Sequence, residues 1–303
     1  MRGRQLPEEA RTLADPDLFA TIEDLELIAR GIVEGFLHGL RRSPYVGFSV
    51  EFASHREYRH GDDLRHLNWK LYARHERLYI KQYDAETNLD CQIALDVSAS
   101  MGASNGGLIK RRYGSILAAA IAHLSHRQRD AVGITLFADK VLAHLKPRAR
   151  STQLDDVLRT IVRAGANPPA ADLGALHEAA ALMPRRGLVI LISDLLFPSE
   201  AVFSALDHFR FRGHDLLVLQ ILDPFERSMP AEGMIRFHDL ETGQELLTRA
   251  EEIRPAYEAA VADWLGELDR GCLGREIDRA TLTTRDPPVK ALAGYLGMLA
   301  HHG

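Results

Sequence analysis

The stretch Cys91–Gly102, "CQIALDVSASMG", joins an apolar run to a segment in which oxygen-bearing side chains alternate. A nearly continuous apolar run is typical of a parallel strand that helices cover on both faces. If the chain stays extended beyond it, Asp96, Ser98 and Ser100 point to one side, because side chains in a strand repeat with period two. Gly102 then lets the backbone turn into the next segment. The stretch therefore predicts a sheet edge that presents a carboxylate and two hydroxyls.

Apolar strands alternate with helical patterns from residue 89 onward. Strands are predicted at 91–97, 131–138, 187–193 and 214–222, and helices at about 108–128, 151–164, 172–183 and 199–212. Alternation of this kind predicts an α/β fold with a doubly wound, mostly parallel sheet and right-handed crossovers. The segment 140–147 is predicted to be an antiparallel edge strand that ends at Pro147.

The flanking segments suggest a four-part organisation. Apolar residues at helical spacing predict a helix over 17–40. Two β-prone arms around 241–244 predict a hairpin, followed by a helix at about 249–271, a strand at 275–284 and a short helix from Pro288. The expected parts are an N-terminal helical segment (1–43), a β-ribbon (44–88), the α/β domain (89–222) and a C-terminal extension that packs on the same domain (223–303).

Composition excludes several classes of protein. Of the 303 residues, 46% are hydrophobic and 26% are charged, which is ordinary for a globular chain. The formal net charge of -5 gives no general attraction to nucleic acid or to anionic membranes. The beginning of the chain lacks the apolar stretch of a signal peptide, and no run approaches the roughly 18 apolar residues of a membrane span. Two cysteines fit a reducing compartment, so we expect a cytoplasmic protein.

A second carboxylate is expected at the same sheet edge. Asp194 follows the strand "VILIS" as Asp96 follows its own strand. Ligands of open α/β sheets bind beyond the carboxyl ends of the strands, where the strand order reverses. Carboxylate and hydroxyl oxygens suit Mg²⁺ or Mn²⁺. The alternative is a purely structural role, in which Asp96 and the serines only cap a helix or make a turn.

Catalytic interpretations find less support in the residues. A phosphatase that uses Asp96 as nucleophile would need an acid two residues later, and that position is Ser98. The chain contains no G-x-x-x-x-G-K-[ST] loop, which excludes ATP hydrolysis by a P-loop. A metal-dependent hydrolase that uses the same strand-end carboxylates remains the alternative to a binding module.

The segment 55–83 interleaves basic and aromatic side chains. Such interleaving can bind single-stranded nucleic acid by stacking and charge, which makes nucleic-acid binding a second alternative. Acidic residues interleave just as densely, which favours a ribbon with internal ion pairs. A docking face for a protein partner is the third interpretation, with these candidate contact residues: Arg59, Asp62, Arg65, Trp69 and Arg74.

Asp96, Ser98 and Ser100, with Asp194 at a later strand end, resemble the metal-ion-dependent adhesion site of von Willebrand factor A domains. The preceding stretch resembles the signature of domain-of-unknown-function family 58, whose members carry that fold and often neighbour MoxR-type AAA+ ATPases. The matching elements are Glu51-Phe52, Arg56-Glu57-Tyr58, Gly61-Asp62-Asp63, Arg65, Trp69-Lys70, Ala73-Arg74 and Leu78.

The resemblance implies a non-enzymatic role. In the adhesion-site arrangement the protein holds Mg²⁺ or Mn²⁺ and an acidic side chain of another protein completes the coordination. It also implies a MoxR-type AAA+ ATPase as partner, with this chain as adaptor or co-chaperone. The usual threonine ligand aligns with Ala171, so the resemblance offers the neighbouring Asp172 as the replacement ligand.

Overall fold

The computed structural model describes the following residues: 22–42, 55–57, 79–81, 90–102, 104, 108–164, 172–183, 186–229, 232–238, 245–293 and 295. The chain divides into two compact units, of which one is His38–Asn88. In that unit β1 (His55–Glu57) and β2 (Tyr79–Lys81) form an antiparallel pair. The five candidate partner contacts between Arg59 and Arg74 lie outside the described residues, and so does the turn predicted at 241–244.

The other unit is built on a six-stranded sheet in the order β10-β7-β6-β3-β4-β5. Its neighbouring strands are parallel except for the antiparallel pair β4 and β5. The four central strands are almost entirely buried, as the apolar runs predict. The strands are β3 (Asp90–Asp96), β4 (Ala131–Phe137), β5 (Val141–Arg148), β6 (Gly187–Ser193), β7 (His214–Leu222) and β10 (Asp278–Thr283).

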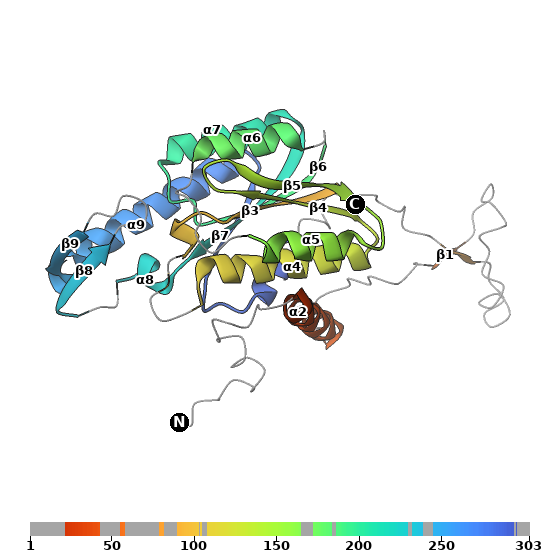
Figure 1. Cartoon of the computed structure of the whole chain (residues 1–303), viewed down its shortest axis with the longest axis horizontal. Helices are drawn as coiled ribbons and strands as arrows, with labels where there is room; N and C mark the ends of the chain where they lie inside the picture. The colour runs from red at the N-terminus through yellow and green to blue at the C-terminus, as the bar shows by residue number, and fades with distance from the viewer. Residues whose placement is uncertain are drawn as a thin grey trace, which may run out of the picture. The chain divides into compact units, whose positions relative to one another are not determined.

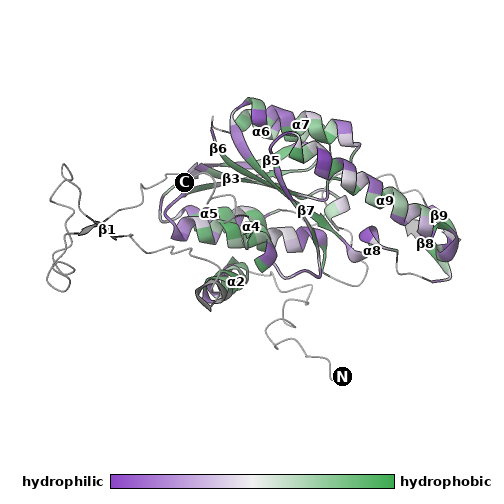
Figure 2. Cartoon of the chain, turned by 180° about the vertical axis from the view of Figure 1, so that it is seen from behind, coloured by the Kyte–Doolittle hydropathy of each residue, from purple (hydrophilic) through white to green (hydrophobic). Residues whose placement is uncertain are grey.

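Helices cover both faces of this sheet (Figure 1). On one face lie α4 and α5, and on the other α6 and α7, with α9 alongside α7. Their bounds are α4 (Lys110–Arg127), α5 (Gln153–Val162), α6 (Leu173–Leu182), α7 (Ser199–Phe211) and α9 (Ala250–Leu273). In Figure 2 the central strands are largely hydrophobic, whereas the helices mix hydrophobic and hydrophilic residues. This two-sided cover confirms the α/β fold class predicted from the alternation of strands and helices.

The order of the strands reverses beside β3. Along the chain, β4 is added on one side of β3 and β6 on the other. The connections that leave the carboxyl ends of β3 and β6 therefore lead away in opposite directions, toward β4 and β7, which is the arrangement at which open α/β sheets bind ligands. Asp96 is the last residue of β3, and Asp194 directly follows β6. The topology thus brings the two predicted carboxylates to one place.

The edge strand β5 is antiparallel, as predicted, and it continues one residue beyond Pro147. Its register with β4 shifts between Val132 and Ile134. A β-carbon on the intervening Gly133 would collide with the Leu145 carbonyl oxygen and the Pro147 nitrogen. Glycine is therefore required at this bulge, because the backbones of two strands approach each other there.

Helices and strands outside the alternating pattern complete the unit. The N-terminal helix α2 (Ile22–Arg42) buries one stripe of apolar side chains, which confirms the helical spacing in this segment. The predicted hairpin is present as β8 (Met234–His238) and β9 (Glu245–Arg249), and β10 of the C-terminal segment pairs with β7 in parallel. A four-residue helix α8 (Pro224–Arg227) was not predicted. Within the described ranges, no helix has the length and apolar character that crossing a membrane requires.

Replacement of Gly133 by alanine tests the bulge. We expect Gly133→Ala to lower the free energy of unfolding by about 1–3 kcal/mol, because the added methyl group overpacks a contact between two backbones. The matched control is Gly31→Ala on the exposed side of α2, where a β-carbon meets nothing within 4 Å. That substitution should stabilise the chain by about 0.5–1 kcal/mol. Urea unfolding measures the stability of both variants. An unchanged midpoint for Gly133→Ala would show that the bulge does not require glycine.

Candidate binding site at the carboxyl edge of the sheet

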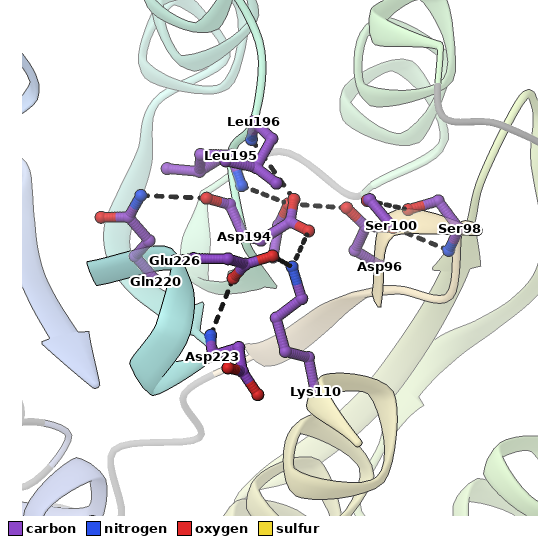
Figure 3. A network of polar contacts seen from close by, with 11 residues as sticks. Asp96, Ser98, Ser100, Lys110, Asp194, Leu195, Leu196, Gln220, Asp223 and Glu226 are labelled. Atoms are coloured by element: carbon purple, nitrogen blue, oxygen red, sulfur yellow. Dashed lines mark hydrogen bonds and ion pairs between the residues drawn. The ribbon is translucent and has the colours of Figure 1, made fainter. Parts of the chain in front are cut away.

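Hydrogen bonds join the two loops that carry the predicted site residues. One oxygen of Asp96 (Oδ1) accepts from the backbone N–H of Ser98 at 2.9 Å. The other (Oδ2) accepts from the hydroxyl of Ser193, the last residue of β6, at 2.6 Å. The hydroxyls of Ser98 and Ser100 share a hydrogen bond of 3.1 Å. Asp96, Ser98 and Ser100 therefore form one cluster (Figure 3). The hydrogen bond from Ser193 ties this cluster to the strand that leads to Asp194.

A lysine that sequence reasoning missed contacts Asp194. Lys110 is the first residue of α4, and its ammonium lies 2.8 Å from Asp194 Oδ2 and 2.5 Å from Glu226 Oε1. The side chains of Lys110 and Asp194 are 0% and 1% exposed, so solvent hardly screens this ion pair. The three residues come from α4, from the loop after β6 and from α8. One ammonium thus connects three segments that are far apart in the sequence.

The short helix α8 fixes the second carboxylate of this ion bridge. Asp223 caps the helix by accepting from Phe225 N–H at 2.8 Å. Glu226 closes a capping box, because its Oε2 accepts from Asp223 N–H at 2.7 Å while Oε1 faces Lys110. Tyr257 of α9 donates to the Glu226 carbonyl oxygen at 2.7 Å. Glu226 is therefore held in position from its backbone and from its side chain.

The loop after β6 makes a tight turn around Asp194. Leu195 has a positive φ of 55°, a backbone conformation that residues other than glycine rarely adopt and that surrounding contacts must hold in place. In this turn Leu195 N–H donates to Ser193 Oγ at 3.1 Å, and Leu196 N–H donates to Asp194 Oδ1 at 3.3 Å. Gln220 of β7 donates to the Asp194 carbonyl oxygen at 2.9 Å. The Leu195 conformation thus belongs to a loop that three hydrogen bonds hold at Ser193 and Asp194.

Burial and charge shift the acidity of the groups in this network. Burial raises the pKa of Asp96 to about 6, and the nearby charge of Asp194 adds to the rise. Burial disfavours the charged form of Lys110, but Asp194 and Glu226 outweigh it, so the Lys110 pKa is raised. Burial also raises the pKa of Glu226, against the opposing effect of Lys110. Asp96 therefore lies next to negative charge, whereas Asp194 and Glu226 each contact the positive charge of Lys110.

The oxygens of this network do not fit the divalent ion that the sequence predicts. Both oxygens of Asp96 accept hydrogen bonds from the protein, and Asp194 is bound to an ammonium. Asp172 caps α6, because its Oδ1 accepts from Gly174 N–H, and Ala171 lies outside the described residues. In the part of the chain that the structure describes, no group of three His, Cys, Asp or Glu side chains could hold a metal. The hydroxyls of Ser98 and Ser100 are too few to hold Mg²⁺ or Mn²⁺ by themselves.

Sequence reasoning found the two strand-end aspartates and missed their cationic partner. A lysine in the first turn of a helix looks like an ordinary surface residue, and its burial follows only from how the helix packs. The four residues Asp223–Glu226, "DPFE", did carry a signal, because Asp followed three residues later by Glu is a capping-box pattern with Pro at the first helical position. That pattern predicts where α8 begins, but it does not predict that Glu226 reaches Lys110.

Comparisons with known proteins place the chain among uncharacterised relatives. The profile of the family described as "Protein of unknown function DUF58" matches residues 54–264. The uncharacterized proteins Rv1480 of Mycobacterium tuberculosis and Mb1516 of Mycobacterium bovis are each 28% identical over 236 residues. Each match covers 76% of this chain and 73% of the relative.

Solved structures give weaker likenesses. The hypothetical protein BatB from Bacteroides thetaiotaomicron is 18% identical, with a TM-score of 0.43 over 70% of this chain and 99% of its own. An aerotolerance-related membrane protein from Bacteroides fragilis is 19% identical, with a TM-score of 0.43 over 67% of this chain and 94% of its own. The SpRpn10 VWA domain is 8% identical, with a TM-score of 0.33 over 67% of this chain and 94% of its own. With TM-scores below 0.5, these likenesses carry no argument about the site.

The raised pKa of Asp96 predicts a pH dependence of stability. The folded chain holds the Asp96 proton up to about pH 6, whereas the unfolded chain releases it near the ordinary value of 3.8. The stabilisation is therefore complete below about pH 4 and is lost as the pH rises through about 6, by about 1.4 kcal/mol per unit of pKa shift. Asp96→Asn should remove this slope in urea unfolding between about pH 4 and pH 7. The exposed control Asp139→Asn should keep this slope. Equal slopes in the unaltered chain, Asp96→Asn and Asp139→Asn would show that Asp96 does not cause the pH dependence.

Glu226→Gln tests the link between α8 and Lys110. An amide cannot serve both the ammonium and Asp223 N–H with oxygen atoms, so one charged hydrogen bond is lost. We expect the free energy of unfolding to fall by about 1–3 kcal/mol. The exposed control Glu258→Gln on α9 should change it by less than about 0.5 kcal/mol. Thermal unfolding separates the two, and equal effects would show that the ion bridge does not stabilise the fold.

Proposed function

This chain belongs to the family described as protein of unknown function DUF58, and we propose that it is a non-enzymatic protein-interaction module. The resemblance seen in the sequence offers the partner class: a MoxR-type AAA+ ATPase, for which this chain serves as adaptor or co-chaperone. The contact surface in this proposal is the carboxyl edge of the sheet around Ser100 and Leu196.

The observation that carries the proposal is a partly exposed rim, formed by Ser100 and Leu196, beside a buried and hydrogen-bonded network. Ser100 is partly exposed and its hydroxyl lies beside the fully buried Ser98. On the facing loop the apolar side chain of Leu196 is 47% exposed, although both its neighbour Leu195 and Asp194 are buried. An exposed leucine next to hydroxyl groups suits a protein contact, in which an apolar anchor is surrounded by polar groups.

The network below this rim favours binding because it is preorganised. Asp96, Ser193 and Lys110 are buried and hydrogen-bonded, so the two loops keep their geometry without a ligand. A surface that is already ordered loses less conformational entropy when a partner binds. The module therefore presents a fixed shape, as an adaptor for a larger assembly requires.

Hydrolysis has less support in the geometry. A nucleophilic serine needs both a base within hydrogen-bond reach and access to a substrate. The hydroxyl of Ser193 donates to Asp96, but Ser193 is fully buried, and the partly exposed Ser100 contacts another hydroxyl, that of Ser98. Asp194 is held in an ion pair with Lys110, so its Oδ2 is already engaged by the ammonium. Assays with phosphate ester and nucleic-acid substrates in Mg²⁺ or Mn²⁺ test this alternative. Turnover that Asp96→Ala abolishes would overturn the proposal of a binding module.

Substitution of Leu196 tests the contact surface. We expect Leu196→Asp to weaken binding of a MoxR-type AAA+ ATPase by about tenfold or more, because it places a charge where an apolar anchor packs. The matched control is Leu182→Asp, at a leucine that is 42% exposed at the end of α6, shortly before β6 begins. Binding is measured as a dissociation constant with purified proteins, with and without a chelator. Equal affinities of the two variants would refute this surface, and a lack of binding by the unaltered chain would refute the partner.

A further inference from the structure

Lys110 occupies a position that is unfavourable for a lysine. It is the first residue of an 18-residue helix, where the positive end of the helix dipole repels cations. Its side chain is 0% exposed, and taking an ammonium out of water costs several kcal/mol unless it is paired. No acidic residue lies in the first turn of α4 to offset this charge. Compensation must come from other segments of the chain.

That compensation comes from two carboxylates that converge on the ammonium. Asp194 lies 84 positions and Glu226 lies 116 positions from Lys110 in the sequence, yet both contact its Nζ atom. Figure 3 shows the ammonium between these two carboxylates, with Asp96 on the far side of Asp194. A lysine at the start of a helix contradicts the local preference for acidic residues there. Such a lysine is expected where the fold needs its positive charge, and here two other segments bring carboxylates to it.

The ammonium also opposes the binding of a second cation. It is a fixed positive charge bonded to the very carboxylate that a strand-end metal would share, and two cations a few ångströms apart repel strongly even at an effective dielectric constant of about 20. The second oxygen of Asp194 faces Leu196 N–H, and both oxygens of Asp96 already accept hydrogen bonds. The carboxylates at this edge are thus satisfied by the protein itself.

We infer that Lys110 is the built-in counter-cation of this edge: its ammonium pairs with Asp194 and Glu226 in the place where a divalent ion would bind, so the native chain needs no metal there. Removal of the ammonium exposes that latent site, because Asp194 and Glu226, whose oxygens lie 2.8 Å and 2.5 Å from Nζ, are then left as neighbouring carboxylates without that positive charge. This property belongs to the isolated chain. Its test therefore needs no partner, and its failure would leave the proposed contact surface untouched.

The experiment compares Mn²⁺ binding and thermal unfolding in the full 303-residue chain. The variants are Lys110→Met, which keeps the length of the side chain without its charge, and Lys140→Met, which removes an exposed lysine after β4 as a control. We expect the unaltered chain and Lys140→Met to show no saturable Mn²⁺ site and no change of Tm with Mn²⁺ or chelator. Lys110→Met should have a lower Tm that Mn²⁺ partly restores, with binding at least about tenfold tighter than in the control.

A further substitution identifies the site that the metal occupies. Asp194→Asn added to Lys110→Met should abolish the gained Mn²⁺ binding. It removes the carboxylate that binds the ammonium in the unaltered chain and that would bind Mn²⁺ in Lys110→Met. The inference is overturned if folded Lys110→Met gains no Mn²⁺ site. It is also overturned if the unaltered chain binds one Mn²⁺ ion and Asp194→Asn removes that binding. This second measurement uses a chain with Lys110 in place, so it decides the question even if Lys110→Met does not fold.

Discussion

One buried ammonium holds together the edge of the sheet on which the site depends. Lys110 extends from the start of α4 to Asp194 after β6 and to Glu226 of α8, with its side chain fully buried. Such an ion bridge adds little net free energy compared with apolar packing, because desolvation offsets most of the attraction. Its effect is on geometry: each carboxylate must face the ammonium, since an unpaired buried charge is costly. The positions of the two loops and of α8 follow from this requirement.

The topology of the sheet explains why these groups meet where they do. Strand order reverses at β3, and the connections beside β3 and β6 diverge there. This edge collects the ends of two strands and the start of one helix, so Asp96 and Ser193 form a hydrogen bond although 97 positions separate them. Polar side chains in such a place must be paired within the protein or bind something from outside. Here the buried polar groups are paired within the protein, whereas Ser100 and Leu196 are partly exposed at the surface.

The same arrangement separates this edge from a metal-based adhesion site. In such a site an open coordination position attracts the carboxylate of another protein. Here Asp194 already has a cation, and Asp172 serves its own helix as a cap. In the proposed contact, recognition at this edge depends on shape and on apolar contact, so its strength depends less on the divalent ions in solution than on the fit of the two surfaces.

The amino-acid pattern alone predicted most of the fold. Strands buried on both faces appear in the sequence as unbroken apolar runs, so the four central strands and the helices between them were predicted within a few residues. It also predicted that Asp96 and Asp194 share one edge, because parallel strands of a doubly wound sheet end on the same side. The β-ribbon turns and the candidate contacts from Arg59 to Arg74 lie outside the described residues.

The tertiary structure decided what those carboxylates bind. Lys110 and Glu226 are separated from Asp194 by long stretches of chain, and no spacing rule relates residues whose contact depends on how α4 and α8 pack against the sheet. Asp172 shows the reverse case, in which a residue adjacent in sequence to the expected ligand position is used by the local helix start. Periodicity reveals which side chains face the core. The partner of a buried charge is set by long-range packing, because electrostatic pairing acts between atoms that are close in space, whatever their distance along the chain.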